Sequence, residues 1–357
     1  MKSVIIHDKI TEFAGSERVL ECIYQVIPSP IYTLICNRDV LLGTQLENAE
    51  IFTTFFQKIP HIGKIFRNLL PFFVIAIEGI NVRNYDLVIS SSHSVAKNVL
   101  TFPHQYHICY CHTPMRYAWD LYFQYWEDMG FKKPLFALLM NYLRVWDRIG
   151  AERVDLFIAN SNYTKERIEK FYGKDAEVLY PPVEIEDVPV IHDKEDYYIT
   201  VSRLVFYKKV DLIMNAFNKI PHRRLIVIGD GPERKKLQKM AGKNINIMGY
   251  KNKDDLIRLL SKARGFIFAA EEDFGIAPVE AQGYGVPVIA FGKGGVLETV
   301  LENETGIFFN EQNEDVLIKA IGRFEGLDFD YEKIKKSARR FSKEIFIEGF
   351  KKVVESL

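Results

Sequence analysis

Two carboxylates and a pair of glycines stand close together in the segment 271–300, and their residue types suit the binding of a phosphorylated sugar. Glu272 and Glu280 lie eight positions apart, and Gly294 and Gly295 follow a run of apolar residues. A carboxylate can only accept hydrogen bonds and so suits hydroxyl groups, whereas bare backbone amides at the start of a helix favour an anion. The segment therefore predicts a site for a sugar and a phosphate. A solvated acid in an ordinary strand–turn–helix unit is the alternative.

Two cations further upstream could serve the same anion. Arg203 and Lys208 follow the apolar run 197–201, which predicts a strand, and they precede an apolar pattern typical of a helix. Arginine offers a planar fork of donors and lysine a compact charge, so together they can clamp a diphosphate. A surface turn with ordinary charges is the alternative. Because no acidic cluster precedes this site, we expect chemistry that needs neither a metal nor a cofactor.

A histidine and a small-residue turn in the first half of the chain are further candidates. His112 ends the alternating run 106–111 and precedes a loop broken by Pro114. Its ring nitrogens can bond sugar hydroxyls or carry a proton, although a lone histidine is more often structural. The turn around Gly15 opens a predicted helix, which would let a phosphate approach the backbone amides.

A metal site in the same alternating run is not expected. His107, Cys109, Cys111 and His112 are metal-ligand types, but they belong to one extended strand, where successive side chains point to opposite faces. Four ligands of a tetrahedral site cannot converge from a single strand.

The segment with the two glutamates resembles the glutamate-x7-glutamate motif of retaining glycosyltransferases of family 4, GT-B-fold enzymes that move a sugar from a nucleotide-sugar. The matching residues are Glu-x-Phe-Gly-x3-Val-Glu-Ala from Glu272, Gly-x-Pro-Val from Gly285, and the glycine pair before Glu298. Arg-Leu-x3-Lys at 203–208 also matches. The turn Ala-Gly-Ser-Glu-Arg at 14–18 departs mildly, with alanine and serine where the family has glycine and alanine.

The resemblance implies a role for each candidate residue. Glu280 would hold the ribose hydroxyls, Glu272 would lie near hydroxyls of the transferred sugar, and Arg203 and Lys208 would bind the donor phosphates. The other implied contacts with the nucleotide-sugar are the backbone amides of Phe274, Gly275 and Ile276 at the sugar or diphosphate, His112 at the sugar, Gly15 at the diphosphate, and Tyr250 and Lys251 beside the base. The family also implies retention of configuration by front-face attack, without a metal ion.

A longer string suggests the substrate. His-Thr-Pro-Met-Arg-Tyr-Ala-Trp-Asp at 112–120 resembles a bacterial mannosyltransferase subgroup of O-antigen and exopolysaccharide assembly. This implies transfer of a hexosyl group, mannosyl first, from GDP-mannose to a glycan or lipid-linked acceptor in cell-surface polysaccharide or lipopolysaccharide synthesis. A UDP-sugar-dependent enzyme of the same family is the nearest alternative. A GT-B epimerase and a non-catalytic nucleotide-sugar-binding subunit are more distant ones.

The candidate residues must be positioned by the ends of strands. Apolar runs alternate with amphipathic stretches over the whole length of the chain, as in parallel α/β domains. Strands are predicted at 3–7, 31–35, 49–52, 87–90, 106–111, 156–159, 197–201, 224–228, 245–248, 265–269, 287–290 and 306–309. A short helix is predicted at 278–283, opened by Glu280. Ser90 to Ser94 are expected to cap a helix at Val95, and Asn160-Ser161 to cap the helix at 165–172.

Prolines and acids at 181–195 predict a linker between two doubly wound Rossmann-like domains. The expected domains are an acceptor-side domain at 1–180 and a donor domain at 196–340. They would face a central cleft, and the last helix at 341–357 would return to the first domain, as in the GT-B fold. Ligands are expected at the carboxyl ends of the strands.

Composition sets broader limits. The 357 residues are balanced at a net charge of +0, which gives no field for a nucleic-acid partner. Four cysteines and an apolar strand directly after Met1-Lys2 favour a reducing cytoplasm. Peripheral contact with the inner face of a membrane is predicted for two stretches: 58–73, where Lys58, His61, Lys64 and Arg67 alternate with apolar residues, and the aromatic-rich 115–146. Ordinary packing of both on a sheet is the alternative.

Overall fold

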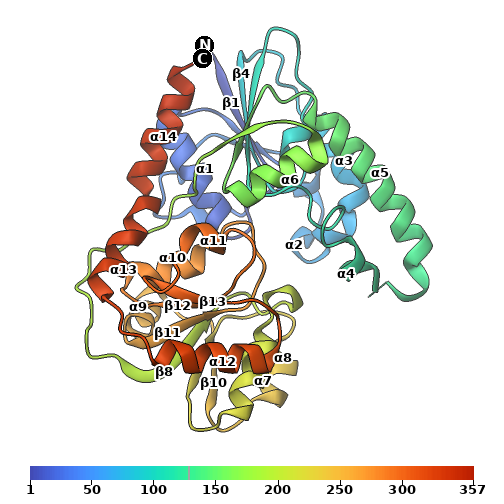
Figure 1. Cartoon of the computed structure of the whole chain (residues 1–357). Helices are drawn as coiled ribbons and strands as arrows, with labels where there is room; N and C mark the ends of the chain where they lie inside the picture. The colour runs from blue at the N-terminus through green and yellow to red at the C-terminus, as the bar shows by residue number, and fades with distance from the viewer. Residues whose placement is uncertain (128) are drawn as a thin grey trace. The chain divides into compact units, whose positions relative to one another are not determined.

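The structure is a computed structural model that describes residues 1–127 and 129–357, with the side chains of Lys64, Arg67 and Asn68 left out of the description. The chain forms two compact units, Met1–Pro182 with Lys343–Leu357, and Val183–Ser342. Each unit holds one parallel sheet covered by helices (Figure 1). The predicted fold class, two Rossmann-like parallel-sheet domains, is confirmed.

The sheet of the first unit has seven strands in the order β3-β2-β1-β4-β5-β6-β7. Their bounds are β1 Ser3–His7, β2 Ile31–Thr33, β3 Ile51–Thr53, β4 Leu87–Ser92, β5 Tyr106–Cys111, β6 Leu156–Ala159 and β7 Ala176–Val178. In the central register, Ile5 lies beside Ile31 on one neighbour and Ile89 on the other. Strand β7 was not predicted from the sequence, because three residues at a sheet edge are too few to show the alternation of apolar and polar residues that marks a strand.

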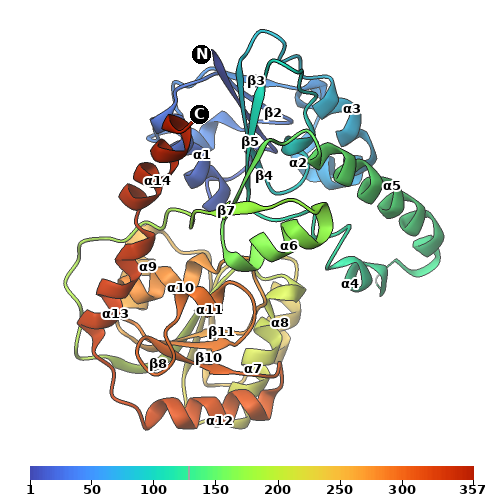
Figure 2. The ribbon, with the colours of Figure 1, turned by 45° about the horizontal axis from the view of Figure 1, so that its top comes forward.

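Helices cover both faces of this sheet (Figure 2). Their bounds are α1 Gly15–Val26, η1 Arg38–Leu41, η2 Phe55–Lys58, α2 Ile62–Ile65, η3 Phe66–Phe72, α3 Phe73–Glu78, η4 Ala96–Asn98, α4 Tyr122–Glu127, η5 Gly130–Lys132, α5 Lys133–Ala151, α6 Asn162–Tyr172 and α14 Lys343–Glu355, where η marks a 3-10 helix. One core packs α1 and α14 together, and another packs α3 with α5. The alternation of β5 separates Cys109 from Tyr110, which lie in different cores.

The second unit has a six-stranded sheet in the order β10-β9-β8-β11-β12-β13. Its strands are β8 Glu195–Val201, β9 Leu225–Ile228, β10 Ile245–Gly249, β11 Ala263–Phe268, β12 Val288–Phe291 and β13 Gly306–Phe309. Its helices are η6 Phe206–Lys208, α7 Val210–Lys219, α8 Arg234–Met240, α9 Lys253–Ser261, α10 Ile276–Gly283, α11 Val296–Thr299, α12 Glu314–Glu325, α13 Tyr331–Ala338 and η7 Arg339–Phe341. Most of the segment 181–195 belongs to this unit, where Val183 pairs with Ser342.

The two stretches expected at a membrane fold differently from each other. In 58–73, the short segments α2 and η3 bury Phe66 and turn Leu69 and Leu70 toward the core; the side chains of Lys64 and Arg67 lie outside the description. In 115–146, Met115 and the partly buried ring of Tyr122 pack inward, whereas one side of α5 is exposed. Among the described residues, no helix is long and apolar enough to cross a membrane.

Candidate active site

In each unit the strand order reverses at one point, and most of the candidate residues follow the strands on either side of it. The reversals lie between β1 and β4 in the first sheet and between β8 and β11 in the second. Connections leave such a pair of strands in opposite directions, which opens a crevice at their carboxyl ends where ligands bind. His7 ends β1 and Ser92 ends β4, while Lys208 and Glu272 follow β8 and β11.

An ion pair occupies the reversal point of the second sheet. Lys208 Nζ contacts Glu272 Oε1 directly. The two side chains are only 21% and 16% exposed, so this pair is less screened than a surface salt bridge. The structure thus brings together two residues that the sequence placed 64 positions apart, and it leaves an anchored ammonium and an anchored carboxylate beside each other.

The backbone of a glycine turn holds Glu272 in place. Gly294 forms a bridge with Glu272, and Gly295 N–H donates to the Glu272 carbonyl at 2.8 Å. Gly294 has a φ of +84°, and a Cβ at this position would collide with that same carbonyl. Only glycine combines this positive φ with so close an approach. The loop after β12 therefore sets the position of the acid after β11.

The predicted helix around Glu280 begins earlier than expected. Gly275, with a φ of +89°, caps α10, so Glu280 is the fifth helical residue and does not open the helix. Pro278 is tolerated in the first turn because its missing N–H would have no partner in the helix. Phe274 is buried against Phe341, with ring centroids 5.2 Å apart, so its side chain is core.

Three further candidates of the second unit lie at the same sheet edge, one after β8 and two after β10. Arg203 is exposed directly after β8. Tyr250 and Lys251 follow β10, two strands away, and Tyr250 is 83% exposed. A hollow of about 450 Å³ near Phe308 is lined by none of the predicted site residues.

In the first unit, a chain of polar contacts leads from a buried carboxylate to His112. Glu17 Oε1 lies 3.6 Å from His7 Nε2. His7 Nδ1 is hydrogen-bonded to Ser91 Oγ at 3.1 Å, and the same hydroxyl is hydrogen-bonded to His112 Nε2 at 2.8 Å. Since one nitrogen of His112 is engaged in this way, the contact orients the ring and constrains its tautomer. Gly15 is the first residue of α1, close to Glu17 in the same turn.

The pKa values in this chain follow from its burial. Burial, helped by the nearby His93 and His7, lowers the pKa of His112 to about 3. For Glu17, burial by itself raises the pKa, but the hydrogen bond and charge of His7, with donors from Ser16 and Ala14, bring it down to about 2. His112 is therefore neutral and Glu17 ionised near neutral pH.

The serine run does not cap a helix, and the expectation of a helix at Val95 is wrong. β4 continues through Ser92, and only the 3-10 helix η4 follows. The backbone N–H groups that needed an acceptor are bound by Asp8, whose carboxylate accepts from four successive residues, 93–96, at 2.6–3.0 Å. Asp8 takes this role because β1 and β4 are neighbours. The predicted cap at Ser161 is confirmed, since its side chain accepts from Thr164 N–H at 3.0 Å.

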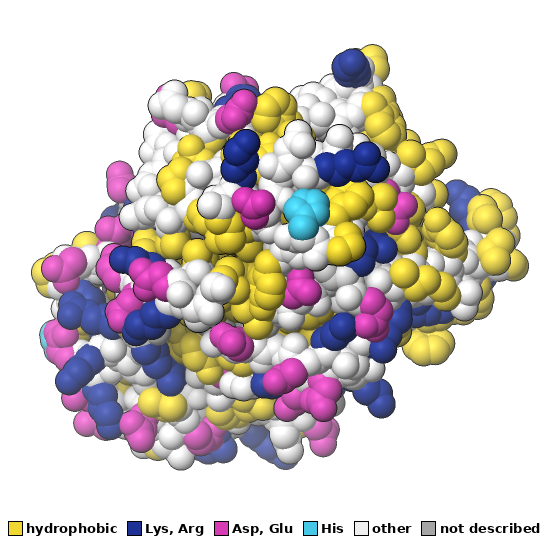
Figure 3. Space-filling view, turned by 90° about the horizontal axis from the view of Figure 1, so that it is seen from above, with side chains coloured by type: hydrophobic (Ala, Val, Ile, Leu, Met, Phe, Trp, Pro, Cys, Tyr) yellow, Lys and Arg dark blue, Asp and Glu magenta, His cyan; other side chains and the backbone are white. Residues whose placement is uncertain are grey.

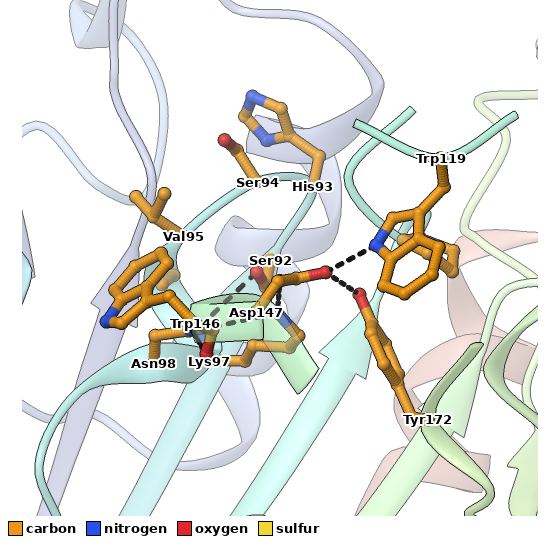
Figure 4. Close-up of polar contacts among 12 residues, drawn as sticks. Ser92, His93, Ser94, Val95, Lys97, Asn98, Trp119, Trp146, Asp147 and Tyr172 are labelled. Atoms are coloured by element: carbon orange, nitrogen blue, oxygen red, sulfur yellow. Dashed lines mark hydrogen bonds and ion pairs between the residues drawn. The ribbon is translucent and has the colours of Figure 1, made fainter. Parts of the chain in front are cut away.

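A buried charge network supports the loop after His112 (Figure 4). Lys97 Nζ contacts Asp147 Oδ1, and both side chains are almost completely buried. Asp147 Oδ2 accepts hydrogen bonds from Trp119 Nε1 and Tyr172 OH, each at 2.8 Å. The network thus joins the segment after β4, the loop of Trp119, α5 and α6.

Sequence reasoning missed His7, Asp8, Glu17, Lys97 and Asp147. A histidine and an aspartate at a strand end are visible signals, but Lys97 and Asp147 lie 50 positions apart, and nothing in the local sequence of either points to the other. Their pairing depends on contact between η4 and α5, which no spacing reveals.

Two family models match successive parts of the chain. Residues 37–187 match Glycosyltransferase Family 4, and residues 184–341 match Glycosyl transferases group 1. An uncharacterized glycosyltransferase of Methanocaldococcus jannaschii is 28% identical over 214 residues, which cover 57% of this chain and 60% of that protein.

One further relative and one solved structure agree with these matches. A GDP-mannose-dependent alpha-(1-6)-phosphatidylinositol monomannoside mannosyltransferase of Mycolicibacterium smegmatis is 27% identical over 207 residues, 49% of this chain and 54% of that protein. The chain thus spans little more than half the length of these two relatives. Anabaena HepE, solved in complex with UDP and glucose, shares the fold with a TM-score of 0.71 and 18% identity, both chains being covered completely. From the two family models and this shared fold, the chain belongs to the glycosyltransferases of the GT-B fold, with a family 4 part followed by a group 1 part.

Proposed function

We propose that this protein is a retaining, metal-independent hexosyltransferase that moves a mannosyl group from GDP-mannose to a glycan or lipid-linked acceptor. The observation that carries the proposal is the Lys208–Glu272 contact at the reversal point of the second sheet. A cation there can bind the phosphates of a nucleotide-sugar, and a carboxylate beside it can accept hydrogen bonds from the hydroxyl groups of the sugar.

In the proposed reaction, the bond between the sugar C1 and the β-phosphate oxygen breaks, and its electron pair leaves with the diphosphate. A bond forms on the same face of C1 to the acceptor oxygen, whose proton passes to the departing phosphate. Arg203, Lys208 and the amides of Phe274, Gly275 and Ile276 stabilise the developing negative charge. Preorganised donors of this kind are usually the largest catalytic contribution.

The other candidates position the donor. Glu280 binds the ribose hydroxyls, Glu272 and His112 bind hydroxyls of the sugar, and Gly15 lies at the diphosphate. Tyr250 and Lys251 lie beside the base. A neutral His112 held through Ser91 can donate or accept a hydrogen bond without adding charge.

The choice of mannose rests on the string 112–120 and on the mycobacterial relative, whose name specifies GDP-mannose. The Anabaena structure, with UDP and glucose bound, favours the second candidate, a UDP-sugar donor. The acceptor class and a role in cell-surface polysaccharide synthesis at the cytoplasmic side of a membrane are part of the same proposal.

Thermal unfolding in the presence of EDTA tests the donor, because a ligand that binds the folded state raises the midpoint. GDP and GDP-mannose are expected to stabilise the protein, and UDP, UDP-glucose and UDP-N-acetylglucosamine are not. Lys208→Ala should abolish the shift, whereas Lys219→Ala, which removes an exposed partner of Glu314, should keep it. Stabilisation by UDP compounds alone would reject GDP-mannose, and no shift from any compound would reject the nucleotide-sugar site.

A further inference from the structure

The loop that follows His112 depends on other elements for its position. Its residues 113–121, all described, form turns between the end of β5 and the start of α4 and belong to neither a helix nor a strand. Ala118 and Trp119 N–H both donate to the Met115 carbonyl, so these bonds stay within the loop. At its first step, Asn160 Nδ2 donates to the His112 carbonyl at 2.8 Å. The path of the rest must therefore be set by side chains from outside.

One arginine of a neighbouring element binds both ends of this loop. Arg167 lies in α6, which follows β6, the neighbour of β5 in the sheet. Its Nη1 donates to Thr113 Oγ1 at 3.0 Å, and its Nη2 donates to Asp120 Oδ1 at 2.6 Å. Thr113 comes directly after His112, and Asp120 ends the string 112–120. Because the planar guanidinium fixes the angle between its donors, one side chain sets the distance between the two ends of the loop.

Both acceptors are oriented by further contacts. The Thr113 hydroxyl donates to the Pro114 carbonyl at 2.9 Å, which leaves the lone pairs of its oxygen for Arg167. The second carboxylate oxygen of Asp120 accepts from Arg116 Nε at 3.3 Å. Arg167 therefore meets two acceptors whose directions are already set, and a small change of the loop would break both contacts.

Stability alone does not account for a charge at this place. Charged side chains of both signs are interspersed on the face seen in Figure 3, where water screens them. Arg167 is instead only 7% exposed, and its guanidinium lies 5.9 Å from the centre of the Phe171 ring, which stacks on Trp119 of the loop at 4.7 Å. Replacing a buried ion pair with apolar side chains is often neutral or stabilising. The specific contribution of an arginine here is the geometry of its two donors.

We propose that Arg167 is a positioning residue for the transfer, which holds the loop in the conformation that presents the His112 ring to the sugar. The inference rests on the proposed function, in which His112 binds sugar hydroxyls. Ser91 orients the ring from β4, whereas Arg167 fixes the residue that follows it. Arg167 acts through Thr113 and Asp120. A displacement of about 1 Å near the reacting atoms can cost about a hundredfold in rate, so this restraint bears on turnover.

Steady-state turnover tests the role. The probe is GDP-mannose, or UDP-glucose where thermal unfolding selects a UDP-sugar. Arg167→Met should lower kcat about a hundredfold and change KM less than about threefold, because Lys208 and the other proposed phosphate-binding side chain lie in the second unit. Arg167→Lys keeps the charge but lacks the fork, so it should not restore kcat. Arg223→Met is the matched control and should keep kcat: Arg223 pairs with Glu325 at the same 2.6 Å, before β9 in the second unit.

Hydrogen exchange reports on the loop directly, with neither donor nor acceptor present. In Arg167→Met, the loop amides that have backbone acceptors should exchange about tenfold faster than in wild type, since two hydrogen bonds from a charged group are lost. These amides are those of His112, Ala118, Trp119 and Leu121. Arg223→Met should leave their exchange unchanged. Urea denaturation shows that each variant is folded under the assay conditions.

Several results would overturn the proposal. They are a normal kcat in Arg167→Met, a raised KM with an unchanged kcat, full recovery of kcat in Arg167→Lys, and loop amides that exchange as in wild type. A lower urea midpoint with a normal kcat would mean that Arg167 serves folding only. A wild-type protein that neither binds nor turns over a nucleotide-sugar would reject the proposed function instead, and exchange would then decide by itself whether Arg167 holds the loop.

Discussion

The two units hold their candidate residues by different means. In the second unit, Glu272 is fixed by the backbone of a glycine turn some twenty residues along the chain, and a partly exposed ion pair with Lys208 completes the arrangement. In the first unit, His112 is held through a chain of side chains from two strands and one helix, and the buried pair Lys97–Asp147 supports the loop after it. Disturbing the second site should therefore affect turnover, and disturbing the first should affect folding.

The largest expected effect is on folding. Lys97→Met leaves the carboxylate of Asp147 buried without its cation, which costs about 3–5 kcal/mol of the free energy of unfolding. Urea denaturation measures it. Lys352→Met removes an exposed partner of Glu348 and should change stability by no more than about 1 kcal/mol. Equal losses in the two variants would show that the buried network does not support the first unit.

Turnover should fall most when the Lys208–Glu272 pair is broken. Lys208→Ala and Glu272→Gln should each lower kcat about a hundredfold to a thousandfold, with a stability change of about 1 kcal/mol or less. Because the two groups act as a unit, the double variant should be little worse than the poorer single one. Steady-state kinetics with the donor found by thermal shift measures this. Fully multiplicative losses would mean that the residues act separately.

A glycine substitution sharpens the contrast between backbone and side-chain control. Gly294→Ala forces a Cβ against the Glu272 carbonyl at a positive φ, which should cost about 1–3 kcal/mol of stability and lower kcat about tenfold or more. Gly322→Ala, within α12, meets nothing within 4 Å and should stabilise the protein by about 0.5–1 kcal/mol. Urea denaturation and steady-state turnover assays on both variants measure these changes. An unchanged kcat in Gly294→Ala would show that the glycine turn does not position the catalytic residues.

The smallest effect is a pH dependence in the first unit. The pKa of His112 is lowered from 6.5 to about 3 in the folded protein, so between pH 6 and 4 the unfolded chain binds a proton that the folded protein does not. Stability must then fall as the pH falls, and His112→Asn should reduce this slope by up to about 1.4 kcal/mol per pH unit. Free energies of unfolding at several pH values measure it. An unchanged slope would show that His112 titrates normally.

The sequence predicted most of the architecture because alternating apolar runs report strand burial directly. β1, β5, β6 and β13 have the expected bounds, and most other strands differ by one or two residues at their ends. The glycine turn and the acid that it holds could be predicted for the same reason, since both lie within one short stretch. The helix of Glu280 began early because the positive φ of Gly275 permits a start that its neighbours do not signal.

By itself, the sequence determined which residues stand at strand ends and which local turns they enter, since periodicity and turn chemistry act over a few residues. Only the tertiary structure decided that Asp8 binds the amides after β4, that Lys97 meets Asp147 across 50 positions, and that one side of α5 faces outward. These outcomes depend on strand order and on the rotation of each helix about its axis, which the packing of the whole unit sets.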